Sequence, residues 1–171
     1  MNKRLVVRVI VFVLFAAVII LIGLKIYSRK TITEYPKVLP EYNFLTTDKN
    51  TFKTDTVKTS SLIIVFYSPD CTFCEHEGAD LSRNSKDFID SKILFVTIEC
   101  TDSARAYSKR FGIDTITNFY SLVDTSYQAL LTFGIKAIPT TLIYDRNRRL
   151  VKVFEGEVNA KKILKTIREN E

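Results

Sequence analysis

The chain has 171 residues, with 25 Lys and Arg against 19 Asp and Glu, and a formal net charge of +6. Six of the basic residues and none of the acids lie in the first 30 residues, so the remaining 141 residues are neutral, with 19 of each sign. The positive charge therefore belongs to one end of the chain, which excludes a nucleic-acid-binding surface on the globular part.

An apolar run near the start of the chain predicts a membrane anchor. Residues 9–24 are 16 consecutive apolar residues, and the run lengthens if Lys25 reaches the membrane surface and Ile26 and Tyr27 lie in the interface. At about 1.5 Å per residue, such a helix spans most of a hydrocarbon core about 30 Å thick. A cleaved signal peptide is the alternative, but the residues after the run are too bulky for a cleavage site. We therefore expect one uncleaved transmembrane helix within an anchor at residues 1–30.

The segment 31–42 predicts a semi-extended linker, because it carries Pro36 and Pro40 among polar residues. The basic start of the chain resembles the first part of a signal peptide, which stays in the cytoplasm. The domain over residues 43–171 would then face the periplasm or the cell exterior, where stable disulfides and dedicated dithiol enzymes are expected.

The first half of this domain predicts a hairpin, two buried strands and a helix. Residues 44–53 form the hairpin around polar turn residues 48–50. Residues 62–67 and 93–98 are apolar and rich in β-branched side chains, as buried strands are. A helix begins at Thr72 between them. We expect it and the residues after it to contact the core through three apolar side chains, Phe73, Leu81 and Phe88.

The second half alternates helices and strands. The expected helices are residues 103–111, 126–133 and 159–168, and the expected strands are 116–122, 140–144 and 150–154. Gly112 and Gly134 end the first two helices, and Asn159 caps the last one. This alternation predicts an α/β fold with a mixed central sheet and helices on both of its faces.

The pair Cys71 and Cys74 follows the first buried strand directly. Two cysteines at this spacing at a helix start can form a disulfide, and the helix N-terminus stabilises the thiolate of the first. This pattern indicates a redox dithiol. A zinc site needs further ligands, for which the chain offers Cys100 and its single histidine, His76. A purely structural disulfide is the other alternative.

Two segments carry a resemblance to a known family. Phe66-Tyr67-Ser68-Pro69-Asp70-Cys71-Thr72-Phe73-Cys74 resembles the active-site segment of the thioredoxin superfamily, and Phe133-Gly134-Ile135-Lys136-Ala137-Ile138-Pro139-Thr140-Thr141 resembles its cis-proline segment. Within the superfamily the chain is similar to the membrane-anchored TlpA-like thiol–disulfide oxidoreductases. They share the anchor, the opening hairpin, an inserted strand and helix, and a glutamate three residues after the second cysteine.

The resemblance implies roles for five residues. Cys71 would attack the substrate and Cys74 would resolve the mixed disulfide. A cis peptide between Ile138 and Pro139 would face the cysteines and hold substrate backbone. Glu77 would tune Cys74 or relay its proton, the alternative being a solvated helix residue.

The remaining reactive side chains have simpler interpretations. We expect His76 to be exposed and Cys100 to be a buried free thiol that packs as a small apolar residue. A third redox cysteine is the alternative for Cys100, and a copper-handling site has little support from one histidine. We expect no metal and no cofactor besides the Cys71–Cys74 disulfide.

The sequence also departs from the family. Asp70 stands where an aromatic residue usually precedes the first cysteine, and Val65 stands where cytosolic thioredoxins bury an acid. Asp70, Glu75 and Glu77 place negative charge around the dithiol, which opposes thiolate formation and favours a reducing couple. We therefore expect a reductase of disulfides in extracytoplasmic proteins, supplied by a membrane dithiol donor. A disulfide-donating oxidase and a non-catalytic binding module with a structural disulfide are the alternatives.

Overall fold

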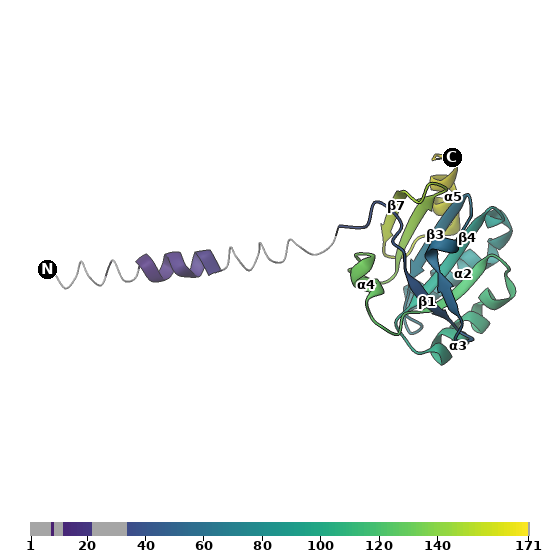
Figure 1. The fold of residues 1–171 in the computed structure, drawn as a ribbon, viewed down its shortest axis with the longest axis horizontal. Coiled ribbons are helices and arrows are strands. Elements are labelled where there is room, and N and C mark those ends of the chain that lie inside the picture. The colour runs from purple at the N-terminus through teal and green to yellow at the C-terminus, as the bar shows by residue number, and fades with distance from the viewer. Residues whose placement is uncertain (1–7, 9–11, 22–33, 171) are drawn as a thin grey trace. The chain divides into compact units, whose positions relative to one another are not determined.

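The computed structural model describes residues 8, 12–21 and 34–170 of the chain, which divides into two compact units, residues 1–34 and 35–171 (Figure 1). In the first unit, residues 12–21 are helical. None of the helices in these described ranges is both long and apolar enough to cross a membrane. Both ends of the predicted anchor lie outside the described residues, so the anchor stays a prediction.

The second unit is built on one seven-stranded mixed sheet with the order β2-β1-β5-β4-β3-β6-β7. The strands are β1 (Asn43–Thr46), β2 (Thr51–Lys53), β3 (Ser61–Phe66), β4 (Ser91–Thr97), β5 (Phe119–Val123), β6 (Thr140–Asp145) and β7 (Leu150–Glu155). β3, β4 and β5 are parallel, and β6, β7 and the β1–β2 hairpin join them antiparallel. The sheet confirms the predicted mixed α/β architecture.

The helices cover the two faces of the sheet unequally. They are α2 (Thr72–Arg83), α3 (Thr101–Phe111), α4 (Ala129–Thr132) and α5 (Ala160–Arg168), with short 3₁₀ turns at Thr54–Thr56, Ser85–Phe88 and Ile113–Thr115. Side chains of α2, α3 and α5 share one core cluster with one face of the sheet. The other face is covered by the short α4 and by the segment around Leu39 (Figure 1).

Strand β3 shows why the apolar run is continuous. Ile63 and Val65 point into the first cluster, while Leu62, Ile64 and Phe66 point into the second. Successive side chains of a strand alternate between faces, so a strand covered on both sides needs apolar residues at every position. All six residues of β3 are buried accordingly.

Most predicted elements are confirmed, with differences at their ends. The β6–β7 pair and α5 lie where expected, and the Asn159 side chain accepts a hydrogen bond from the Lys162 N–H at 2.9 Å. The helix predicted at 126–133 is shorter, Ala129–Thr132. The expectation for Phe73 is wrong, because its side chain is 62% exposed. It lies outside the buried stripe of α2, which is made by Cys74, Glu77, Gly78 and Leu81.

Residues 35–42, which the sequence assigns to the linker, run along the β6–β7 turn. The Leu39 N–H donates to the Arg148 carbonyl and the Leu150 N–H donates to the Lys37 carbonyl, both at 2.8 Å. Leu39 is buried in the second core cluster. This segment therefore belongs to the folded unit.

Candidate active site

The two cysteines lie where β3 passes into α2. Cys71 is the N-cap of α2, with extended backbone, and its sulfur accepts the Cys74 N–H at 3.4 Å. This places the Cys71 sulfur at the positive end of the helix, where a thiolate is stabilised. Cys71 is half-buried, Cys74 is 1% exposed, and both are free thiols. An accessible thiol above a shielded one suits an attacking and a resolving sulfur.

Burial makes the Cys74 thiol a weaker acid. Desolvation raises the pKa of Cys74 well above its ordinary value, and its hydrogen bond with Cys71 raises it further. The Cys74 thiol therefore needs a proton acceptor before it can attack as a thiolate.

Glu77 is a candidate for that proton acceptor, because it lies three residues after Cys74 on the buried stripe of α2. The structure buries it to 1% exposure, so the alternative of a solvated helix residue is wrong. The Thr141 hydroxyl donates to one carboxyl oxygen at 2.5 Å, and the Val158 N–H donates to the other at 3.4 Å. Burial raises the pKa of Glu77 from 4.5 to about 7, although both hydrogen bonds act in the opposite direction. Val65, where cytosolic thioredoxins bury an acid, is apolar core here.

The proline loop lies beside the dithiol. β6 begins at Thr140, which pairs with Phe66 at the end of β3, so the loops bearing Pro139 and Cys71 emerge next to each other. The Ile138–Pro139 peptide bond is cis, as expected. Ile138 and Cys71 both pack against the first core cluster. In the described part of the chain, the backbone N–H and carbonyl of Ile138 make no hydrogen bond, which leaves them available to an extended substrate.

The charges around the dithiol are less negative than the sequence suggests. Arg110 of α3 binds both carboxyl oxygens of Glu75, at 2.5 and 3.2 Å. Glu77 is close to half-protonated near pH 7. His76 is exposed as expected, with its Nδ1 3.6 Å from a carboxyl oxygen of Glu157. Two of the three acids invoked for a reducing couple are therefore paired or partly neutral, which weakens that electrostatic argument.

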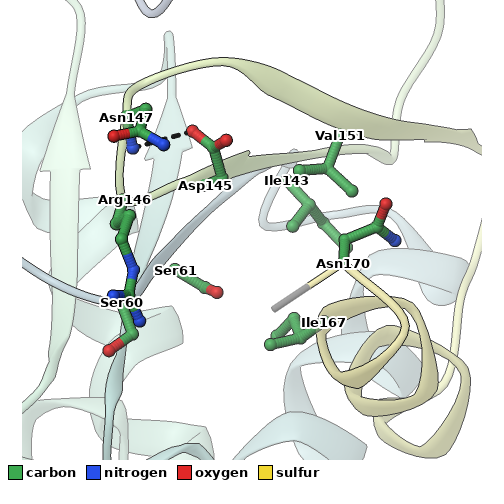
Figure 2. Close-up of a pocket in the computed structure, with 9 residues that line it drawn as sticks. All are labelled: Ser60, Ser61, Ile143, Asp145, Arg146, Asn147, Val151, Ile167 and Asn170. Carbon is green, nitrogen blue, oxygen red and sulfur yellow. Dashed lines mark hydrogen bonds between the residues drawn. The ribbon is translucent and has the colours of Figure 1, made fainter.

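A separate pocket lies at the other end of β3 (Figure 2). Its volume is about 80 Å³, and it is lined by Ser60, Ser61, Ile143, Asp145, Arg146, Asn147, Val151, Ile167 and Asn170. Ser61 begins β3, whereas the cysteines follow its last residue, so this pocket is not part of the dithiol site. Among residues 8, 12–21 and 34–170, no group of three or more His, Cys, Asp or Glu side chains could hold a metal ion.

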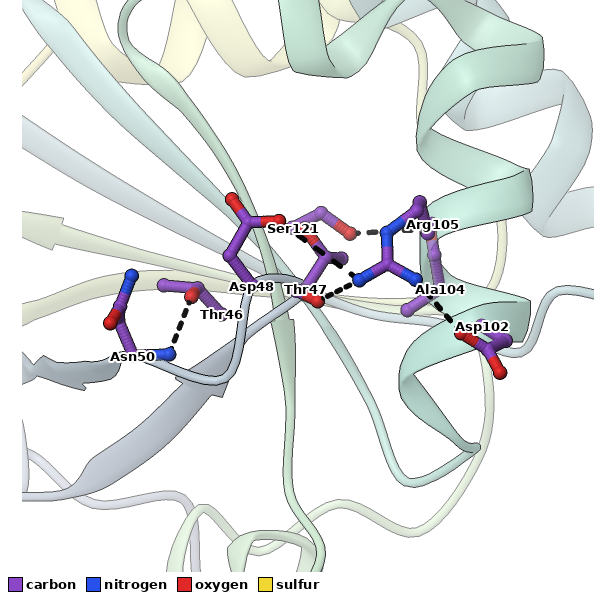
Figure 3. A network of polar contacts seen from close by, with 8 residues as sticks. All are labelled: Thr46, Thr47, Asp48, Asn50, Asp102, Ala104, Arg105 and Ser121. Carbon is purple, nitrogen blue, oxygen red and sulfur yellow. Dashed lines mark hydrogen bonds and ion pairs between the residues drawn. The ribbon is translucent and has the colours of Figure 1, made fainter.

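The expectation for Cys100 is wrong, because this cysteine is exposed. It follows β4 as the N-cap of α3, where its sulfur lies 3.3 Å from the Ser103 hydroxyl. Hydrogen bonding to Ser103 lowers the pKa of the Cys100 thiol. One turn along, Arg105 donates to the Thr47 carbonyl and to Asp102 (Figure 3), which ties the start of α3 to the hairpin turn.

Three residues at the site were not singled out for their roles from the sequence. Thr141 holds Glu77, the Tyr107 hydroxyl donates to the Cys74 carbonyl at 2.5 Å, and Gly78 makes room for that hydroxyl. Of the three, only Gly78 gives a signal in the sequence, because a glycine inside a helix often marks a place where another group packs closely against the helix backbone.

Comparisons with known proteins agree with this geometry. Residues 48–170 match the family model of the thioredoxin-like domain. The chain is 21% identical over 166 residues to the thiol-disulfide oxidoreductase ResA of Geobacillus thermodenitrificans, covering 95% of this chain and 93% of that protein.

Two solved structures show the same fold. The pneumococcal exposed lipoprotein thioredoxin Etrx1 of Streptococcus pneumoniae has a TM-score of 0.62 and 24% identity, covering 76% of this chain and 99% of that chain. The peroxidoxin BcpB of Mycobacterium tuberculosis has a TM-score of 0.70 and 14% identity, covering 81% and 99%.

Proposed function

This chain belongs to the thioredoxin-like domain family, and we propose that it is a thiol–disulfide oxidoreductase that reduces disulfides of extracytoplasmic proteins. The observation that carries the proposal is the arrangement of the two thiols. Cys71 is accessible at the N-cap of α2, Cys74 is buried below it, and the cis-proline loop lies alongside.

The exchange takes two steps. The Cys71 thiolate attacks one sulfur of the substrate disulfide, forming a mixed disulfide and releasing the other sulfur as a thiolate. The Cys74 thiolate then attacks the Cys71 sulfur, which releases the second substrate thiolate and leaves the Cys71–Cys74 disulfide. The substrate gains two electrons and two protons, and a dithiol donor must return two electrons to the chain.

Glu77 fits the second step as a proton acceptor. It lies three residues after Cys74 on the buried stripe of α2, and its pKa of about 7 suits proton transfer at neutral pH. The uncommitted backbone of Ile138 supports a role in holding the substrate in an extended form.

The direction and the place of the reaction are further parts of the proposal. The apolar run at residues 9–24 supports a membrane anchor with the domain on the periplasmic or outer side. A membrane dithiol protein would then be the electron donor. Asp70 is the acid near Cys71 that still supports a reducing couple, and the similarity to ResA supports the class of reaction.

The decisive experiment is the equilibrium redox potential of the Cys71–Cys74 pair against glutathione. We expect a value below about −250 mV, which is typical of reductants. A value near −120 mV would assign the chain to the disulfide-donating enzymes. A bond that mild reductant does not open in the folded protein would instead indicate a structural disulfide.

Trapping of mixed disulfides tests which cysteine attacks the substrate and which resolves the mixed disulfide. Cys74→Ser leaves the attacking thiol without its resolving partner, so disulfide-linked adducts should accumulate and disappear on reduction. Cys71→Ser should trap few, because Cys74 is buried. Equal trapping by both variants would contradict the assignment.

A further inference from the structure

A buried tyrosine holds the redox helix from the neighbouring helix. The Tyr107 hydroxyl of α3 donates to the backbone carbonyl of Cys74 at 2.5 Å, in a fully buried contact. A carbonyl oxygen has two acceptor sites, and in an α-helix one of them is used by the N–H four residues later. Tyr107 therefore fixes the position of Cys74 itself, from outside the helix that carries it.

Gly78 makes this contact possible. A Cβ atom added at Gly78 would overlap the Tyr107 hydroxyl oxygen and approach its Cζ to 3.0 Å. Glycine inside a helix is less favourable than alanine, because it loses more backbone freedom on folding. Gly78, one turn after Cys74, therefore lowers the intrinsic stability of α2 and lets the hydroxyl reach the Cys74 carbonyl.

The rest of the cluster holds Tyr107 in place. Its ring packs on Tyr67, which follows β3, with centroids 4.3 Å apart, and on Phe111 at 4.7 Å. The ionisable groups that act on Cys74 are Cys71 at the start of its helix and Glu77 within it. Cys74 in turn raises the pKa values of Tyr67 and Tyr107 across from it. Both tyrosines are buried, and desolvation raises their pKa values, so they stay neutral at physiological pH.

We propose that Tyr107 and Gly78 form a positioning pair that keeps Cys74 shielded beneath Cys71 and thereby sets the reactivity of the resolving thiol. This inference rests on the proposed function, because Cys74 is a resolving thiol only if the chain exchanges disulfides. Without the hydroxyl, the backbone of Cys74 loses its hydrogen bond to α3, although the Arg110–Glu75 pair still joins the two helices, and water reaches the Cys74 sulfur. Solvation of the thiolate then lowers the pKa of Cys74.

The test is the pH dependence of Cys74 alkylation by iodoacetamide. The background carries Cys71→Ser and Cys100→Ser, so Cys74 is the one cysteine left of three. Into it are placed Tyr107→Phe, which removes the hydroxyl, and Gly78→Ala, which keeps the hydroxyl and displaces it. We expect both to shift the alkylation midpoint to lower pH. A midpoint one pH unit lower gives about ten times faster alkylation at a fixed pH below it.

Combining the two changes provides a second measurement. If both remove the same contact, Gly78→Ala together with Tyr107→Phe should shift the midpoint no further than either alone. The matched control is Tyr144→Phe, which removes a buried tyrosine hydroxyl on the other face of the sheet, where it donates to the Pro36 carbonyl at 3.3 Å. Tyr144→Phe should leave the pH dependence of Cys74 alkylation as it is in the Cys71→Ser, Cys100→Ser protein.

An unchanged profile in both Tyr107→Phe and Gly78→Ala would overturn the inference. An equal shift in Tyr144→Phe would also overturn it, because general loosening would then explain the effect. Alkylation needs no substrate turnover, so its outcome is separate from that of the proposed function. A chain that reduces no disulfide would refute the proposed function and leave this positioning result intact.

Discussion

The raised pKa of Glu77 gives a pH-dependent stability whose size follows from the structure. An acid that binds its proton more tightly when folded contributes a penalty that grows as the pH rises from its unfolded pKa to its folded pKa. The free energy of unfolding therefore falls between pH 4.5 and about 7 and levels off above. The difference of about 2.5 pH units corresponds to about 3 kcal/mol at 1.36 kcal/mol per unit.

Glu77→Gln removes this titration and keeps the shape of the side chain. We expect the variant to equal the wild type within about 1 kcal/mol at pH 4.5 and to exceed its unfolding free energy by about 3 kcal/mol at pH 8. Part of this gain is offset because an amide accepts less well than a carboxylate from the Thr141 hydroxyl and the Val158 N–H.

The measurement is urea unfolding of both proteins across pH 4.5 to 8, with both thiols kept reduced. The difference between the two curves isolates Glu77, because the nearby acids Asp80 and Glu157 are common to both. A difference that does not change with pH would refute the reasoning. A wild type that gains stability relative to the variant as the pH rises would show that the hydrogen bonds outweigh burial and that the pKa of Glu77 is lowered.

Three further predictions concern other parts of the chain. Cys100 should react with maleimide at pH 7 well before Cys74 in the reduced wild type, as peptide mass spectrometry would report; faster reaction of Cys74 would contradict the assigned exposures. Asn159→Ala should lower the unfolding free energy by about 1 kcal/mol in urea, because it removes the cap at the Lys162 N–H, and an unchanged midpoint would show that the cap contributes nothing. The full chain should stay with membranes after alkaline carbonate washing, whereas deletion of residues 1–34 should release a soluble domain; a mature chain that starts near residue 25 would show cleavage instead.

The sequence predicts the framework because burial on both sides of a sheet leaves a visible pattern. The continuous apolar run of β3 follows from burial on both faces of the sheet, and the spacing of apolar residues in α5 follows from the 3.6-residue turn of a helix. The redox pair and the cis-proline loop were also predicted, since each is a short motif at a fixed place. The end of the linker was not, because Leu39 is a single apolar residue whose packing partners are distant in the chain.

The exposure of single residues was the weakest part of the prediction. Cys100 follows an apolar strand and looks like core, yet the helix cap turns its sulfur to solvent. Phe73 shows the same limit, since position within a helix, and not hydrophobicity, decides that its ring is exposed. Single residues at the ends of elements carry no periodic signal, so their environment is set by tertiary contacts.

Glu77 links the cysteine segment to the cis-proline segment, a contact that neither motif predicts from its own residues. Its carboxyl receives a hydroxyl from Thr141, two residues after Pro139, and an N–H from the loop before α5. The helix that begins after Cys71 and the strand that follows Pro139 are thus joined through one ionisable group. Hydrogen bonds favour its charged form and burial favours its neutral form, and their balance sets a pKa of about 7. A carboxyl of that pKa fits the role of proton acceptor that we propose for Glu77 in the second step of the exchange.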